Sequence, residues 1–140
     1  MNRFVLDCSV TVAWFFEDEF DKYSELVRQA LLKKGVAAVT PSIWPAEVTR
    51  VLYQAERRKR IDAAQVNQAV RVLSQLPIEV DYLPLGSMGH VLRLCRTHTL
   101  TSYDALYLEL ALRENMPLAT GDKKLKASAA AAGIEVFGQE

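Results

Sequence analysis

Short apolar runs alternate with longer amphipathic segments along the whole chain. Five of the short runs have the length and composition of β-strands: Arg3–Asp7, Val36–Val39, Glu79–Tyr82, Pro117–Ala119 and Ile134–Phe137. Seven longer segments, with apolar residues at helical spacing, predict helices: Val10–Phe16, Asp21–Lys34, Trp44–Arg60, Ala63–Leu76, Ser87–His98, Ser102–Asn115 and Lys123–Ala132. Strands that alternate with helices are typical of a parallel sheet covered on both faces. The pattern therefore predicts an α/β fold, a three-layer α/β/α sandwich around a five-stranded, mostly parallel sheet.

Local chemistry supports several boundaries of these elements. Asp62 followed by Gln65 is a capping-box pattern at a helix start. Gly35 and Gly133 each stand just past a predicted helix, where a left-handed residue is common. The chain has no internal repeat or convincing linker, and its 140 residues suffice for one ordinary core. We therefore expect a single domain that covers residues 1–140.

Composition narrows the class of protein. Half of the residues are apolar, which is typical of a globular chain, and no apolar stretch approaches the ~20 residues needed to cross a bilayer. The opening apolar run is interrupted at Asp7, so it does not resemble a signal peptide. Cys8 and Cys95 form no disulfide framework and match no zinc spacing. We expect a cytoplasmic protein without a membrane segment.

The charge of the chain is balanced overall but uneven locally. Seventeen basic and seventeen acidic residues leave no net field that would attract nucleic acid. Basic residues nevertheless gather at Arg50 and Arg57–Arg60, at Arg93 and Arg96, and at Lys123, Lys124 and Lys126. A concentrated acidic cleft with basic flanks could bind a polyanion through those flanks and a metal ion. The alternative for each basic cluster is a solvated helix face.

Four acidic residues stand beside apolar runs, where a carboxylate is costly. Asp7 ends the first strand, Glu47 lies near the start of a helix, Asp104 lies in the first turn of another, and Asp122 follows the fourth strand. A buried carboxylate needs a positive partner, and no Lys or Arg stands close in sequence to Asp7 on the exit side of its strand. If the fold brings the four groups together, a bound divalent metal is the expected compensator. Their mutual repulsion should then raise the pKa of one or two of them.

Each acid also has a structural interpretation. Asp7 could cap the following helix, although Ser9 could do so equally well. Thr101 and Asp104 resemble a capping box, but Leu108 lies one turn after Asp104 and places that side of the helix against apolar packing. Taken alone, the two interpretations of Asp104 are evenly balanced.

The evidence for a functional role is weaker for Glu47 and for Asp122 when each residue is considered alone. Pro45 fits only in the first turn of a helix, so Glu47 could be an exposed first-turn acid favoured by the helix dipole. Asp122 could be an N-cap, while Gly121 permits a tight turn that lets the backbone approach a ligand. The set of four carries the functional hypothesis, because no single member does.

Four segments in series resemble a known family: Val-Leu-Asp7-Cys-Ser9-Val, Pro41-Ser-Ile-Trp-Pro-Ala-Glu47-Val, Leu100-Thr-Ser-Tyr-Asp104-Ala-Leu-Tyr and Leu-Ala-Thr120-Gly-Asp122-Lys-Lys-Leu. In this order, and over nearly the whole chain, they resemble the PIN-domain ribonucleases. More narrowly, they resemble the VapC toxins of bacterial and archaeal toxin–antitoxin pairs.

The resemblance implies a five-stranded parallel sheet and an endoribonuclease that depends on Mg²⁺ or Mn²⁺. It also implies a homodimer and a cognate antitoxin, whose C-terminal segment occupies a hydrophobic groove and reaches the acidic cleft with a basic side chain. The acidic site positions of the family fall on Asp7, Glu47, Asp104 and Asp122. The small hydroxyl residues beside the metal fall on Ser9 and Thr120.

Hard divalent ions prefer oxygen ligands, which agrees with this acidic set. We expect Asp7 and Asp104 to hold the principal metal. Asp122 and Glu47 would act through water, on a second ion, or by orienting the nucleophile.

Other classes of protein fit less well. A phosphate-accepting signalling domain needs a second acid beside Asp7, where Cys8 stands, and an acid-nucleophile phosphatase needs an Asp at the position of Ser9. The remaining alternative is a catalytically inactive PIN-like module that binds protein or RNA.

Overall fold

A four-stranded parallel sheet forms the centre of the structure, a computed structural model that describes residues 2–139. Its strands are β1 (Asn2–Leu6), β2 (Val36–Pro41), β3 (Ile78–Asp81) and β4 (Leu118–Ala119). They lie in the order β3-β2-β1-β4, and every neighbouring pair is parallel. The first strand is therefore central, between the second strand and the last. The ends of β1 and β4 meet at one edge of the sheet, because parallel strands run in the same direction.

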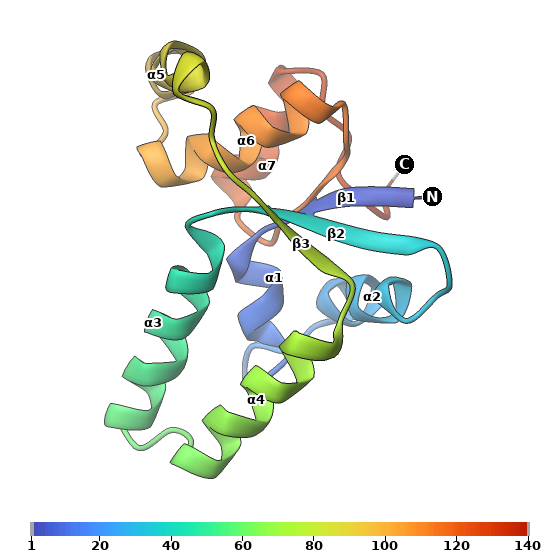
Figure 1. Ribbon diagram of the computed structural model, residues 1–140, viewed down its shortest axis with the longest axis vertical. Helices are drawn as coiled ribbons and strands as arrows, with labels where there is room; N and C mark the ends of the chain where they lie inside the picture. Colours follow the sequence, from blue (N-terminus) through green and yellow to red (C-terminus); the bar gives the residue numbers. More distant parts are fainter. Residues whose placement is uncertain (1, 140) are drawn as a thin grey trace.

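Helices cover both faces of this sheet (Figure 1). One face carries α1 (Cys8–Ala13), α2 (Lys22–Leu31), α3 (Trp44–Arg57) and α4 (Ala63–Gln75). The other carries α5 (Met88–His98), which follows the 3₁₀ turn η1 (Leu85–Ser87), with α6 (Ser102–Glu114) and α7 (Lys123–Ala131). The predicted three-layer α/β/α sandwich is confirmed. No helix among residues 2–139 is long and apolar enough to span a membrane.

The prediction of a fifth strand at Ile134–Phe137 is wrong for the described residues. This segment forms one isolated parallel bridge, between Leu118 and Val136. Its length is limited on both sides by left-handed glycines, Gly133 (φ +82°) and Gly138 (φ +79°). The neighbouring β4 has only two residues to pair with, because the chain leaves the sheet at Thr120. The segment therefore packs against the sheet edge without extending it.

The core explains why the sheet has this position. Phe4, Val5 and Leu6 are fully buried in succession, which requires packing on both faces of β1. Helix α6 is buried over most of its length, since it lies among β1, β2, α5 and α7. The predicted capping box of α4 is present: Asp62 Oδ1 accepts from Gln65 N, and Gln65 Oε1 accepts from Asp62 N, both at 2.8 Å. The core thus fixes the ends of β1 and α6, where the predicted site residues stand.

Candidate active site

The carboxyl ends of β1 and β4 bring distant parts of the chain together. Asp7 follows β1 directly, and its backbone N–H donates to the carbonyl of Ala119, the last residue of β4, at 3.0 Å. Thr120 and Gly121 follow Ala119 and therefore stand beside Asp7. The ends of parallel strands are the usual place for a ligand in an open α/β sheet.

Asp7 is buried, with 6% of its surface exposed, and two hydroxyl groups hold its carboxylate. Ser9 Oγ and Thr120 Oγ1 both donate to Asp7 Oδ2, each at 2.7 Å. The hydroxyl oxygens in turn accept from the loop after β4: Ser9 Oγ from Gly121 N at 3.0 Å, and Thr120 Oγ1 from Asp122 N at 3.0 Å. Asp7 stands at the N-cap position of α1 but makes no side-chain capping bond. Its carboxylate is therefore not used as a helix cap.

The environment of Asp7 opposes its ionisation. Burial raises the pKa of Asp7 to about 6, while the hydrogen bonds from Ser9 and Thr120 lower it. The negative charges of Asp104 and Glu47 raise this pKa further. Asp7 is thus electrostatically coupled to two of the other predicted site residues. The expected direction of the pKa shift is confirmed, but burial contributes more to it than the repulsion between the acids does.

Asp104 occupies the first turn of α6 and is half-buried. Thr101 caps this helix by accepting a hydrogen bond from the backbone N–H of Asp104 at 3.1 Å. Burial and the charge of Asp122 raise the pKa of Asp104, whereas the Thr101 side chain and the positive charge of Lys124 lower it. Asp104 is therefore coupled to Asp122 as well as to Asp7.

Asp122 is exposed and caps α7. Its Oδ1 accepts from the backbone N–H of Leu125 at 2.9 Å, so the capping interpretation of this residue is correct. Its charge nevertheless acts on Asp104 across the cluster. Capping one helix and facing a neighbouring acid are compatible, because the second carboxylate oxygen is not used by the cap.

Glu47 is half-buried in the first turn of α3, where Pro45 also lies, as the sequence predicted. Its Oε1 accepts a hydrogen bond of 2.5 Å from the Tyr107 hydroxyl. Tyr107 lies on α6 and is fully buried. Tyr107 is not among the residues predicted from the sequence, although its place one turn after Asp104 puts both residues on the same side of the helix.

The four acids form electrostatically coupled pairs, Asp7 with Asp104 and with Glu47, and Asp104 with Asp122, but do not close into a cage. Within residues 2–139, no group of three or more Asp, Glu, His or Cys side chains is close enough together to hold a metal ion by itself. Mg²⁺ usually keeps several waters and is held by one or two carboxylates together with substrate phosphate. An all-oxygen set centred on Asp7 and Asp104 fits such a hydrated ion by its chemistry. Cys8 is not a competing nucleophile, because burial and nearby acids raise its thiol pKa to about 12.

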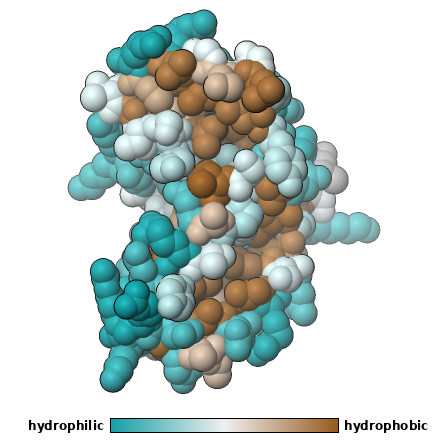
Figure 2. All heavy atoms as spheres, turned by 60° about the vertical axis from the view of Figure 1, so that its left-hand side comes forward, coloured by the Kyte–Doolittle hydropathy of each residue, from teal (hydrophilic) through white to brown (hydrophobic). Residues whose placement is uncertain are grey.

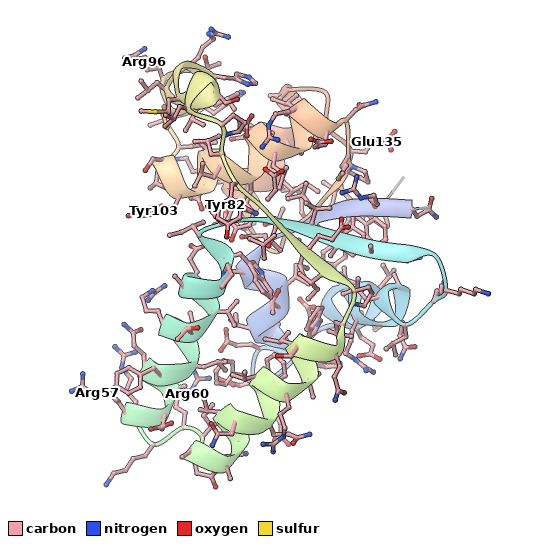
Figure 3. The ribbon with its side chains drawn as sticks, in the orientation of Figure 1. Arg57, Arg60, Tyr82, Arg96, Tyr103 and Glu135 are labelled. Atoms are coloured by element: carbon pink, nitrogen blue, oxygen red, sulfur yellow. The ribbon has the colours of Figure 1, made fainter. Side chains whose placement is uncertain are left out.

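Exposed aromatic side chains stand in the first turn of α6 and just after β3. Tyr103 precedes Asp104 and is 57% exposed, and Tyr82 is 78% exposed; both project on the side of the ribbon where α3 and α6 begin (Figure 3). Figure 2 shows apolar residues gathered in an upper and a lower region of this face, over α5–α6 and over α3–α4 respectively. The lower region includes a groove of about 270 Å³ between α3, α4 and β3. The groove begins at Trp44 and Pro45, in the first turn of α3, which also carries Glu47.

Known proteins resemble this chain in sequence and in fold. The family model described as PIN domain matches residues 4–131. Ribonuclease VapC1 of Mycobacterium tuberculosis is 34% identical over 110 residues, which cover 75% of this chain and 77% of that protein. The crystal structure of PAE2754 from Pyrobaculum aerophilum has a TM-score of 0.67 at 25% identity, covering 91% of this chain and 79% of that one. The structure of VapBC2 from Rickettsia felis, bound to a DNA fragment from their promoter, has a TM-score of 0.66 at 16% identity, covers 96% of both chains and supports the fold. The match over residues 4–131 and the identity with a VapC ribonuclease show that this chain belongs to the PIN-domain family, as a VapC-type member.

Proposed function

We propose that this protein is a divalent-metal-dependent endoribonuclease that acts as the toxin of a toxin–antitoxin pair. The observation that carries the proposal is the buried carboxylate of Asp7. Two hydroxyls donate hydrogen bonds to it at 2.7 Å, and the negative charges of Asp104 and Glu47 oppose its ionisation. Such a cluster is costly without a cation, so selection for stability alone would not favour it. Its family membership adds the reaction class, hydrolysis of RNA phosphodiester bonds.

The proposed roles follow from the position of each side chain. Asp7 and Asp104 would hold Mg²⁺ or Mn²⁺, with Asp122 on the exposed side. When bound, the ion would lower the pKa of a coordinated water and neutralise charge on the scissile phosphate. Ser9 and Thr120 would keep the Asp7 carboxylate in one orientation, because both donate to the same oxygen. Glu47, on α3, would bind the ion through a coordinated water and orient that water for attack.

The basic residues nearest the cluster would supply local attraction for RNA, since the chain has no net charge. Lys124 is close enough to lower the pKa of Asp104. Arg50 follows Glu47 by one turn of α3 and is exposed. We propose that these two cations contact the RNA backbone on opposite sides of the acids, because phosphate contacts position a substrate without reading its sequence.

A cognate antitoxin is the proposed protein partner, and the groove between α3 and α4 is its proposed binding site. Trp44, Val48 and Leu52 of α3 line this groove opposite Val70 and Leu73 of α4. It begins in the same turn of α3 that carries Glu47, so a segment lying in it could reach the acidic cluster with a basic side chain. The structural neighbour VapBC2 supports a partner of this kind.

A homodimer is the proposed assembly. Leu85, Met88 and Leu92 are 85%, 52% and 50% exposed on η1 and α5. An exposed apolar patch of this kind marks an interaction surface. We propose that a second copy of the chain covers it.

Cleavage assays with Asp104→Asn test the proposed activity. We expect the purified protein to cut structured RNA with Mn²⁺ or Mg²⁺ and not with EDTA, and the variant to cut at least about 100-fold more slowly. The variant should bind RNA as well as the wild type does, because it removes a negative charge. RNA binding that needs no metal and leads to no cleavage would instead support an inactive RNA-binding module.

A further inference from the structure

The Tyr107 hydroxyl connects the two helices that carry Glu47 and Asp104. It donates to Glu47 Oε1 at 2.5 Å, a contact between residues 60 positions apart. This length lies at the short end of the range for hydrogen bonds from a hydroxyl to a carboxylate, which are among the stronger hydrogen bonds in proteins. Tyr107 follows Asp104 by one turn of α6, so one helix supplies both an acid of the cluster and a donor to another acid.

The burial of the two partners differs, and this difference assigns their roles. Tyr107 is fully buried, so the packed core fixes its ring and its hydroxyl. Glu47 is half-buried, and its side chain has three rotatable bonds, which would rotate freely if nothing but solvent contacted the carboxylate. Tyr107 is thus a rigid donor, and Glu47 is the group that gains a defined orientation. A fully buried residue cannot touch RNA, so any effect of Tyr107 on the reaction must pass through Glu47.

We propose that Tyr107 is a positioning residue, whose hydroxyl holds the Glu47 carboxylate toward Asp7 and Asp104 for metal binding and catalysis. This inference rests on the proposed nuclease function for its catalytic part. Burial and the hydrogen bond to Glu47 both raise the pKa of Tyr107, so the phenol keeps its proton and remains a donor. Removal of an outer partner that orients a metal-site carboxylate typically costs about 10- to 100-fold in metal affinity or activity.

Tyr107→Phe removes only the hydroxyl and is the central test. We expect kcat for RNA cleavage and the affinity for Mn²⁺, measured by calorimetric titration without RNA, each to fall about 10-fold or more. The KM for RNA should stay unchanged. Tyr23→Phe is the matched control, since the Tyr23 hydroxyl also donates one hydrogen bond, to the Phe137 carbonyl at 2.8 Å. This control should lose stability in a thermal melt without losing Mn²⁺ affinity or kcat.

A double-mutant cycle with Glu47→Gln separates positioning from a general loss of packing. If Tyr107 acts through Glu47, Tyr107→Phe should cost nothing further in the Glu47→Gln background. Multiplicative losses, or a Tyr107→Phe protein with wild-type Mn²⁺ affinity and kcat, would overturn the inference. Glu47→Asp gives a second approach should Tyr107→Phe fold poorly, because the shorter carboxylate no longer reaches the hydroxyl and should reproduce the loss. A wild-type protein that binds Mn²⁺ without cutting RNA would refute the nuclease proposal alone, and the cycle on Mn²⁺ affinity would still decide the role of Tyr107.

Discussion

At the level of single residues, Asp7 differs from the other three acids in its burial and in its hydrogen bonds. It is the only member of the acidic set that is almost completely buried, and it has both hydroxyl partners on one oxygen. Those two hydrogen bonds do not offset its burial, because the net effect raises its pKa to about 6. The ionised form therefore makes the metal-free fold less stable at neutral pH.

Asp7→Asn should stabilise the metal-free protein while abolishing cleavage. A folded-state pKa of about 6, against an ordinary value of 3.8, means that the folded protein binds a proton more tightly than the unfolded chain does. Wild-type stability should thus fall as pH rises from about 4 to about 6, by at most about 3 kcal/mol. Urea unfolding in EDTA should give the variant a larger free energy of unfolding than the wild type at pH 8, and an equal one near pH 4. A variant less stable than the wild type at pH 8 would contradict this account of Asp7.

At the scale of elements, ion pairs of Arg113 connect α6 to the end of β3. Arg113 of α6 donates to Glu109 at 2.8 and 3.1 Å and to Asp81 at 2.6 Å. Glu109 is almost completely buried, with 1% of its surface exposed. Since α6 also carries Asp104 and Tyr107, this group holds the helix that supplies two residues of the site.

Arg113→Ala should therefore be strongly destabilising, by about 3–5 kcal/mol, because it leaves the buried Glu109 without a positive partner. Arg28→Ala is the control: Arg28 forms an ion pair of 2.7 Å with Glu25 on the surface of α2, and its loss should cost below about 1 kcal/mol. Urea unfolding measures both values. Adding Glu109→Gln to Arg113→Ala should recover part of the loss, whereas no recovery would mean that Arg113 acts through packing rather than charge.

Helices and strands were predictable where the local sequence pattern determines them. They were less predictable where their formation depends on pairing with a segment far away in the sequence. The run Phe4–Leu6 and the capping residues of α4 are local signals, and both predicted the structure correctly. The segment Ile134–Phe137 has a strand-like sequence, but its pairing depends on β4, which ends at Ala119 as the chain turns into the site. The contact of Tyr107 with Glu47 joins two helices, and neither residue signals its partner in the sequence.

At the scale of the whole molecule, the site joins segments from both ends of the chain. Asp7 follows β1, Glu47 lies in the first turn of α3, Asp104 lies in the first turn of α6, and Asp122 follows β4. The strand ends were predictable meeting points, because parallel strands align their carboxyl ends. The helical acids depended on packing that the sequence did not specify. Which acids contact the ion stays a prediction, since the four form coupled pairs rather than a closed cage.

Divalent metal should stabilise the folded protein, because an ion bound among these segments binds the folded state and not the unfolded chain. With Mn²⁺ at 100 times its dissociation constant, the expected gain is about 2.7 kcal/mol. Thermal melts with Mn²⁺ and with EDTA measure this gain, and a protein with both Asp7→Asn and Asp104→Asn serves as the control that should not respond. Equal midpoints for the wild type under both conditions would argue against a shared metal site.

The pairing of the first strand with the last has a consequence for synthesis of the protein. Asp7 is translated early, but Thr120, Gly121 and Asp122, which complete its surroundings, leave the ribosome only after nearly all of the helices have been made. A nascent chain that stops short of β4 leaves one side of β1 unpaired and the Asp7 carboxylate without its Thr120 partner. For the proposed ribonuclease, the surroundings of Asp7 are therefore complete only once β4 has been made and has paired with β1.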